Sequence, residues 1–308
     1  MRIISGDEIA TVLTGRELVE TLRRAYRSET VVPDPGRFEI ERPDNRSAFL
    51  KVSPAWTNFP AQGHTDRGYI GCTLAVDLPA LSQGAESLPG SRSTSGVYLL
   101  MSGTHGHPIA LLDGVSLGIW RSCAQHALAM HYLAREDASR LLVLGRPPHL
   151  EQLLDAYCCV RDIRSVLFVG ADQAQTCKRL SSSSAFPKVH FDWTDDVSGA
   201  ISGADIICCP PGYPQLLEEH GIAEGVHIDM LGQPDSLAPG IADAARLFVG
   251  DRNDSNAADL ADIAADLREL AQGIKAGRRF YSQTTLFMSG DSTGLPDLAT
   301  AGHVFLRT

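Results

Sequence analysis

The run Leu141-Leu142-Val143-Leu144-Gly145-Arg146-Pro147-Pro148-His149-Leu150 decides the fold of this chain. Its leading apolar residues, closed by a glycine, predict a buried parallel strand that ends in a tight turn. Apolar residues then recur at helical spacing from Leu150 to Val160, and a second apolar run follows at Val166–Val169. Strand, turn, helix and strand in this order form the opening of a Rossmann-type nucleotide-binding sheet.

The turn in this run departs from the pattern G-x-G-x-x-G/A that holds a dinucleotide. In that pattern the second glycine lets the backbone approach the pyrophosphate, which free N–H groups at the helix start then bind. Here Pro147 and Pro148 occupy positions that should offer donors, and proline has no N–H. A hydrogen bond to a charged group contributes about 1.5–3 kcal/mol, so losing two weakens phosphate binding by roughly two to four decades. Either the prolines only start the helix, with no dinucleotide on it, or the cofactor is held another way, for example by the Arg146 guanidinium.

Length and charge argue against several classes of partner. With 308 residues, of which 44% are hydrophobic, the chain holds one large or two ordinary domains. Its formal net charge of −10 argues against nucleic acid or an anionic membrane as a partner. No apolar run reaches the ~18–20 residues of a membrane span, and the charged N-terminal segment lacks the apolar core of a signal peptide. The sequence therefore predicts a cytoplasmic protein.

The cysteines and histidines do not form a metal-binding pattern. The 7 cysteines include no C-x-x-C pair, and their odd number argues against a disulfide framework. The 10 histidines are scattered, and the close pairs His105/His107 and His126/His131 do not have the i, i+4 spacing of two ligands on one helix face. The motifs G-x-S-x-G, P-loop and H-E-x-x-H are absent. We expect free thiols, no metal and none of the standard hydrolase, kinase or zincin sites.

The regions on either side of the opening run extend the α/β pattern. Before it we expect strands at Met1–Ile4, Ala48–Val52 and Gly68–Leu78, a helix up to residue 25, an exposed loop at Gly84–Ser95, a hairpin of Gly96–Met101 and Pro108–Asp113, and a helix from about Ser116 to Leu133. After it we expect short strands at Val189–Phe191, Ile206–Cys209, Val226–Met230 and Leu247–Val249, an amphipathic helix at Ala257–Lys275, and a tail, Thr284–Arg307, that returns to the first domain. These elements predict a Rossmann-like domain of residues 115–283 and a second domain of residues 1–114 plus 284–308.

Three segments carry a resemblance to a known family. They are Pro108–Gly114 (PIALLDG) followed by Trp120–Ala124 (WRSCA), then Gly225–Gly232 (GVHIDMLG), and last Gly277-Arg278 with Thr284–Phe287 (TTLF). Their order and spacing resemble the ornithine cyclodeaminase/μ-crystallin family, where the stretches read P-x-A-l-l-D-g … R-T-A-A, G-x-h-i-n-a-i-G and G-k-x-x-G-R … i-t-l-F. The resemblance implies a Rossmann domain joined to a second α/β domain that binds substrate and forms a homodimer. It also implies NAD(P)-dependent chemistry between an amino acid and an imine.

The carboxylate-binding residues carry over only in part. The resemblance assigns Arg121, and Arg37 near the N-terminus, to the substrate carboxylate. The family's substrate lysine follows a glycine in a G-v-K strand, but the stretch here is Gly71-Cys72-Thr73, so the lysine is absent. Lys51, one strand earlier, is the candidate to replace it. Cys72 is either a nucleophile near the substrate or a small apolar filler.

The acid/base and cofactor positions are also altered. The family's catalytic Asp would stand two residues after Gly232, where this chain has Pro234, so Asp235 or Asp229 is the expected substitute. For the cofactor we expect Gly145 at the turn, Arg146 beside the phosphates and Asp172 at the ribose. The alternative for Asp172 is an acid that only favours the start of the next helix.

These departures leave three functions open. The first is a diverged enzyme that acts on a small amino acid, imine or related carboxylate, with NAD(P) use altered or lost. In this hypothesis Arg37 and Arg121 hold a carboxylate. The second is a conventional NAD(P)-dependent imine reductase, amino-acid dehydrogenase or cyclodeaminase with an unusual phosphate loop. The third is a non-catalytic binding or scaffold protein on the same fold.

Overall fold

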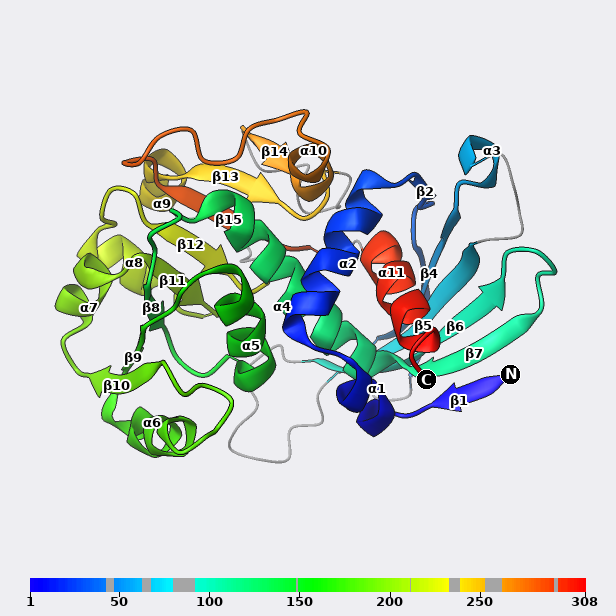
Figure 1. The fold of residues 1–308 in the computed structure, drawn as a ribbon, viewed down its shortest axis with the longest axis horizontal. Coiled ribbons are helices and arrows are strands. Elements are labelled where there is room, and N and C mark those ends of the chain that lie inside the picture. The colour runs from blue at the N-terminus through cyan, green and yellow to red at the C-terminus, as the bar shows by residue number, and fades with distance from the viewer. Residues whose placement is uncertain are drawn as a thin grey trace. The chain divides into compact units, whose positions relative to one another are not determined.

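The computed structural model describes residues 1–42, 47–62, 68–79, 92–147, 149–210, 212–232, 239–252, 262–290 and 293–308. These fall into two compact units, the first made of Met1–Ser122 with Thr293–Thr308 and the second of Cys123–Ser292. Each unit has a sheet of its own, and helix α4 (Gly114–Leu133) contributes residues to both units (Figure 1).

The first unit is built on a seven-stranded, mostly antiparallel sheet. Its strand order is β1-β7-β6-β5-β4-β2, with β3 also paired to β4, and β1 runs parallel to β7. The predicted hairpin is confirmed, and its second strand has the bounds Pro108–Asp113 that the sequence indicated. The strands are β1 (Arg2–Ile4), β2 (Thr30–Val31), β3 (Gly36–Ile40), β4 (Ala48–Thr57), β5 (Tyr69–Pro79), β6 (Arg92–Ser102) and β7 (Pro108–Asp113).

Helix α11 (Gly294–Phe305) lies against one face of this sheet, and α2 (Gly15–Arg27) packs on α11. Helix α2 buries its apolar side, and α11 contacts α2, β4 and β5. Side chains alternate along a strand, so Gly71 and Thr73 of β5 face α11, whereas Cys72 points to the opposite face. The short helices of this unit are α1 (Gly6–Val12) and α3 (Phe59–Gln62).

The second unit is built on an eight-stranded sheet whose paired strands run parallel. Its order is β10-β9-β8-β11-β12-β15-β13-β14, which reverses between β8 and β11. Such a reversal is the switch point at which open α/β sheets take their ligands. The predicted Rossmann-type α/β class is therefore confirmed. The strands are β8 (Arg140–Val143), β9 (Ser165–Val169), β10 (His190–Thr194), β11 (Ile206–Cys209), β12 (His227–Met230), β13 (Arg246–Val249), β14 (Ala265–Asp266) and β15 (Thr285–Met288).

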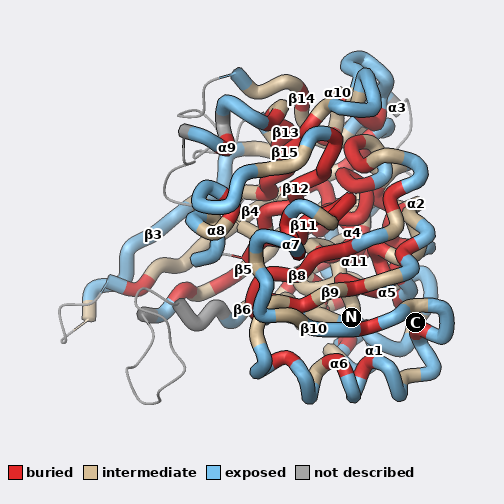
Figure 2. Tube along the Cα trace, turned by 90° about the vertical axis from the view of Figure 1, so that its left-hand side faces the viewer, coloured by how far each residue is buried: buried red, intermediate tan, exposed pale blue. Residues whose placement is uncertain are grey.

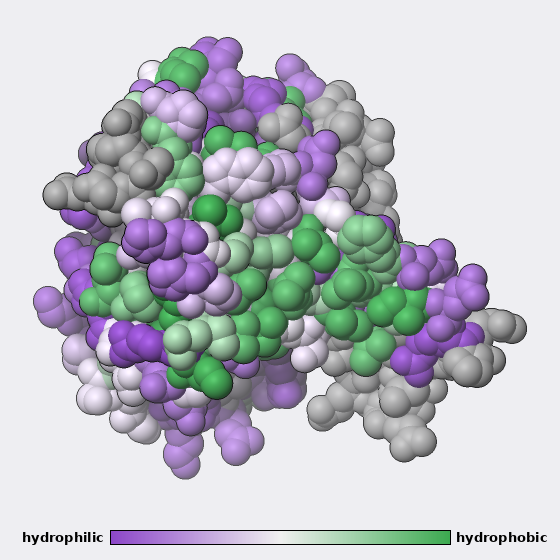
Figure 3. All heavy atoms as spheres, turned by 90° about the vertical axis from the view of Figure 1, so that its right-hand side faces the viewer, coloured by the Kyte–Doolittle hydropathy of each residue, from purple (hydrophilic) through white to green (hydrophobic). Residues whose placement is uncertain are grey.

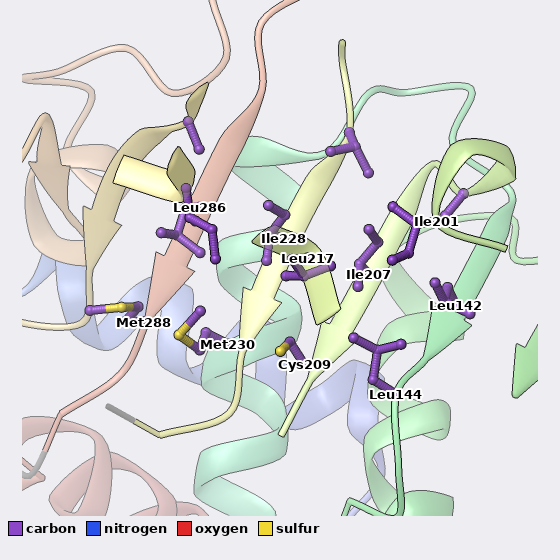
Figure 4. Close-up of a cluster of buried hydrophobic side chains, with 14 of the residues drawn as sticks. Leu142, Leu144, Ile201, Ile207, Cys209, Leu217, Ile228, Met230, Leu286 and Met288 are labelled. Atoms are coloured by element: carbon purple, nitrogen blue, oxygen red, sulfur yellow. The ribbon is translucent and has the colours of Figure 1, made fainter. Parts of the chain in front are cut away.

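The core of the second unit lies on its inner strands. Every residue of β11, β12 and β15 is buried, and the inner part of this sheet is red in Figure 2. Figure 4 shows Ile207, Ile228 and Leu286 side by side across these strands, with Leu142 of β8 beside them. Burying each such side chain stabilises the fold by about 1.5–3 kcal/mol. The helices of this unit are α5 (Leu150–Val160), α6 (Ala174–Ser181), α7 (Val197–Gly203), α8 (Pro214–His220), α9 (Pro239–Ala244) and α10 (Leu267–Ala271), with the 3-10 helix η1 (Ala171–Gln173).

The C-terminal third differs from the sequence-based expectation in two places. Within the helix expected at Ala257–Lys275, residues 253–261 lie outside the described part, and the described remainder is helical only at Leu267–Ala271. Asp266 and Glu269 form a capping box that starts the helix there. The segment expected to return at Thr284 instead supplies β15, a strand between β12 and β13, and only the residues from Thr293 belong to the first unit.

The loop expected at Gly84–Ser95 lies mostly outside the described residues. The described end of this segment begins β6 at Arg92, where it pairs with Pro79 of β5. The strand therefore starts earlier than the polar composition of this segment indicated, because pairing with β5 satisfies its backbone groups whatever its side chains are.

Candidate functional site

The turn after β8 lies at the switch point of the second sheet. Gly145 has a φ of +61°, a left-handed conformation that favours glycine. A Cβ at this position would collide with the aromatic ring of Tyr213, which follows β11 on the other side of the switch point. Gly145 therefore provides the predicted tight turn. Because it has no side chain, it also leaves room for the ring of Tyr213.

The prolines remove donors from the rest of the turn, but the start of α5 keeps N–H groups that the helix does not use. Pro147 is buried, and Pro148 lies outside the described residues. His149 has a left-handed φ of 57° and makes no side-chain cap on α5. The first intrahelical bond runs from the Leu153 N–H to the His149 carbonyl at 3.1 Å, so the amides between these two residues are not used inside the helix. Glu151 brings a carboxylate to this first turn and forms an ion pair with an arginine of α6.

The structure brings together two of the cofactor candidates, Arg146 and Asp172. The Arg146 Nη2 atom lies 3.0 Å from Asp172 Oδ2 and donates to the Asp172 carbonyl at 3.0 Å. Gln173 also donates to Asp172 Oδ2, at 2.9 Å. Both charged side chains are more than 60% exposed, at 66% and 62%, so the pair itself adds little stability. Asp172 also lies in the first turn of η1, where an acid is favourable.

In the first unit Arg121 pairs with an internal carboxylate. Its Nε atom lies 3.1 Å from Asp297 Oδ1 of α11, and Thr73 Oγ1 donates to Asp297 Oδ2 at 2.8 Å. The Arg121 and Asp297 side chains are only 14% and 6% exposed. The carboxylate that Arg121 contacts is thus one of the chain's own. Sequence reasoning did not find Asp297; the signal was an acid within an otherwise apolar helix.

A buried tyrosine completes this cluster. Tyr98 lies directly opposite Thr73 in the β5–β6 pair and is 1% exposed. Its hydroxyl faces Gly71, where a Cβ would collide with it, and it has no hydrogen-bond partner among the described residues. Burial, and then the charge of Asp297, hold the Tyr98 pKa well above its usual value. This hydroxyl therefore keeps its proton and remains a donor without an acceptor.

The other candidates of the first unit divide between two faces of the sheet. Lys51 and Arg37 pair directly across β4 and β3, so they share a face. Lys51 Nζ forms an ion pair with the buried Asp77 at 3.0 Å, and the Arg37 guanidinium lies 3.8 Å from the ring centre of Phe49. Both cations are thus already engaged by side chains of neighbouring strands, Lys51 by β5 and Arg37 by β4.

Cys72 does not join these cations. It pairs with Pro54 of β4, three residues from Lys51, so strand alternation places the thiol on the opposite face. Burial raises the pKa of the Cys72 thiol, which disfavours the reactive thiolate. Both observations favour the apolar filler over the nucleophile.

Asp229 is not placed to act directly on a substrate. It lies on β12 with 0% exposure, and its Oδ1 atom is 2.6 Å from His126 Nδ1 of α4. Tyr157 of α5 donates its hydroxyl to the other carboxylate oxygen. Both oxygens are thus occupied inside the unit. The second substitute, Asp235, lies outside the described residues.

No metal site or membrane helix appears in the described part of the chain. Among those residues no group of three His, Cys, Asp or Glu side chains is arranged to hold an ion. No described helix combines the length and apolar character needed to cross a bilayer. All seven cysteines are free, as predicted.

Comparison with known proteins agrees with the fold and the ordered motifs. The model of the ornithine cyclodeaminase/mu-crystallin family matches residues 78–307. The chain belongs to this family. A Delta(1)-pyrroline-2-carboxylate reductase of Colwellia psychrerythraea is 27% identical to it over 99% of this chain and 98% of that protein.

Solved structures show the same fold. The Delta(1)-pyrroline-2-carboxylate reductase of Thermococcus litoralis, in complex with NADH and L-proline, has a TM-score of 0.79 at 21% identity and covers 100% of this chain and 97% of its own. An archaeal alanine dehydrogenase dimer with bound NAD has a TM-score of 0.77 at 19% identity, with 100% and 95% coverage.

Proposed function

We propose that this family member acts on a small amino acid, imine or related carboxylate, and that its use of NAD(P) is altered or lost. The observation that carries the proposal is the turn at the switch point. There Pro147 lacks the N–H that a pyrophosphate needs, and Tyr213 packs on Gly145 where the dinucleotide pattern requires open backbone.

A conventional pyrophosphate site does not fit these residues. Besides the missing N–H, the first turn of α5 carries Glu151, whose charge opposes a second anion at the same helix end. Arg146 is turned to Asp172 rather than left to a phosphate. The proposed function therefore includes no hydride transfer from a dinucleotide bound at this turn.

The carboxylate end of the substrate is assigned to Arg121. A guanidinium binds a carboxylate through two parallel hydrogen bonds, and Thr73 and Tyr98 add neutral hydroxyl groups to the same cluster. A bound carboxylate would share Arg121 with Asp297, which already holds it. This competition favours a ligand that also accepts a hydrogen bond from the Tyr98 hydroxyl.

Two titrations test the proposal. Calorimetry with NAD(H) and NADP(H) up to millimolar concentration is expected to give weak binding or none. Thermal shift with L-proline, L-alanine and Δ1-pyrroline-2-carboxylate is expected to raise the melting temperature, and Arg121→Lys is expected to reduce that rise, because a lysine does not form the bidentate contact. A micromolar dissociation constant for a dinucleotide, or no response to any small carboxylate, would reject it.

The second candidate is a conventional NAD(P)-dependent imine reductase, and Asp172 favours it. This carboxylate stands after β9, where ribose-binding acids occur, and it is exposed. The names of the relatives point the same way. Oxidation of NADH with Δ1-pyrroline-2-carboxylate as substrate distinguishes the two candidates. A conventional imine reductase would oxidise NADH in this assay, whereas the first proposal expects no NADH oxidation.

We further propose a homodimer, built on the face of the first sheet opposite to α2 and α11. Apolar side chains of alternate strand positions gather there, and they are only half buried; Figure 3 shows apolar residues collected on the side that it views. These residues are Leu50, Val52, Trp56, Leu74, Val76, Leu99 and Leu111. A large exposed apolar face in a single chain promotes association. Light scattering at micromolar concentration should give twice the chain mass, and a stable monomer would refute the assignment.

A further inference from the structure

Three polar side chains of the second unit form a continuous hydrogen-bonded line. Ser289 Oγ lies 2.9 Å from His126 Nε2, and His126 Nδ1 lies 2.6 Å from Asp229 Oδ1. The three residues come from the segment after β15, from α4 and from β12, so only the folded unit brings them together.

The tautomer of His126 sets the direction of these bonds, and the tautomer with its proton on Nδ1 matches a carboxylate partner. An ionised carboxylate only accepts, so the Nδ1–H of His126 donates to Asp229. The Nε2 atom of the neutral ring then has a lone pair, which accepts the Ser289 hydroxyl proton. Tyr157 donates to the second oxygen of Asp229 and Phe287 meets the imidazole edge-on at 5.3 Å, so the ring is held in this orientation.

Ser289 is the end of the line that lies nearest to solvent. His126 and Asp229 are 2% and 0% exposed, whereas Ser289 is 9% exposed. It directly follows Met288, the last residue of β15, and therefore lies at the carboxyl edge of the sheet (Figure 4). Open α/β sheets bind their ligands at this edge. Next to it, Gly250 after β13 has no side chain that could cover the hydroxyl.

A serine does not need an imidazole to satisfy its hydroxyl. Ser182 and Ser202 of the same unit donate to backbone carbonyls one helical turn earlier, at 2.9 and 2.8 Å. Ser289 instead contacts a side chain that can take its proton. A nucleophile within hydrogen-bond reach of a base, with the base oriented by a third group, is the arrangement that activates serine in hydrolases of unrelated folds.

We propose that Ser289 is an activated nucleophile, with His126 as its base and Asp229 as a positioning residue, and that it accepts acyl groups from small esters. In the first step Ser289 Oγ bonds to the ester carbonyl carbon, while its proton moves to His126 Nε2. The C–O bond to the alcohol then breaks, and the alcohol leaves with that proton. Water, deprotonated by His126, releases the acid and restores the serine. This activity is independent of the function proposed above.

A small sulfonyl fluoride tests the activation directly. The full chain is incubated with phenylmethanesulfonyl fluoride, which transfers its sulfonyl group to an activated serine as fluoride leaves and the serine proton passes to His126. Peptide mass spectrometry then measures the modification of each serine. We expect Ser289 to react faster than Ser182 and Ser202, both of which are exposed at the surface. No modification of Ser289, or equal modification of all three, would overturn the proposal.

Variants of the line separate activation from packing. His126→Gln keeps a hydrogen-bonding side chain but is no base, so it should lower the labelling rate by about 10²-fold or more. Asp229→Asn should also lower the rate, because the imidazole loses the partner that sets its tautomer. His227→Gln is the matched control, since it replaces another fully buried histidine of the same unit, one that bonds to Thr285 and lies outside the Ser289–His126–Asp229 line, and its rate should stay close to that of the unaltered chain. If either of the first two variants folds, as judged by circular dichroism, and still labels at the unaltered rate, the proposal fails.

Discussion

Two buried carboxylates, one in each unit, are stabilised by different kinds of partner. Asp297 of the first unit binds a permanent cation, Arg121, and a threonine hydroxyl. Asp229 of the second unit binds an imidazole and a phenol, neither of which is a permanent cation. The first carboxylate is thus balanced by charge and the second by directed hydrogen bonds. A charge-balanced pair depends on both charges being present, whereas a hydrogen-bonded line can pass a proton.

The largest expected effect comes from Asp297→Ala. This variant removes the carboxylate that balances Arg121 in a mostly buried position, and breaking such a pair costs about 3–5 kcal/mol. Urea unfolding followed by circular dichroism measures the loss. The double variant Arg121→Met with Asp297→Leu should regain most of the stability, because no charge is left buried. Asp229→Asn should lower the free energy of unfolding by less than Asp297→Ala does. Equal losses would contradict the proposed difference between the two carboxylates.

A buried histidine outside the Ser289–His126–Asp229 line gives the next effect. His227 is 0% exposed, and its Nδ1 atom lies 3.0 Å from a threonine hydroxyl, Oγ1 of Thr285. Burial lowers the pKa of His227 from 6.5 to about 4. Between these values the unfolded chain takes up a proton that the folded chain does not, so stability should fall as the pH drops from 6.5 to 4. The loss approaches roughly 3 kcal/mol, and His227→Asn should flatten this part of the stability–pH curve.

Tyr157→Phe tests the hydrogen-bonded side of the comparison. The change removes a donor from Asp229 inside a fully buried site, and a hydrogen bond to a charged group contributes about 1.5–3 kcal/mol. Thermal and urea unfolding should both show a loss of this size. A neutral outcome would mean that Asp229 does not need its second donor.

The smallest effect is expected at Tyr98→Phe, in the other cluster. This hydroxyl is buried and has no partner among the described residues, so removing it should change the free energy of unfolding by less than about 1 kcal/mol or raise it slightly. The two Tyr→Phe variants form a matched pair, because both rings are almost fully buried. A loss for Tyr98→Phe as large as that for Tyr157→Phe would reveal a partner for the Tyr98 hydroxyl.

Local patterns predicted the elements well, but not the contacts between them. The apolar run Ile206–Cys209 and the hairpin strand Pro108–Asp113 have the bounds that their composition indicated. The strand Thr285–Met288 was missed as part of the sheet, because its insertion between β12 and β13 leaves no trace in its own residues. Periodicity identifies a buried strand, but it does not say which neighbours the strand joins.

The site residues show the same limit. Arg121 was found, but its partner Asp297 lies 176 residues away along the chain. Asp229 was considered as an acid/base on a substrate, whereas its partner His126, 103 residues away, occupies it inside the core. Strand alternation could have separated Cys72 from Lys51, but only once the register of their strands was known. Long-range pairing therefore determines which polar residues meet.

The position of β15 also decides how late in synthesis this chain can finish folding. The second sheet has a gap between β12 and β13 until Thr285–Met288 has been made, and the first sheet lacks α11 until Gly294–Phe305 follows. Both units thus wait for segments that follow all their other strands along the chain. Until then two apolar strand edges and an apolar sheet face stand open, a state that invites pairing with other chains. A stop codon shortly before Thr285 would therefore yield two incomplete units rather than one intact and one missing.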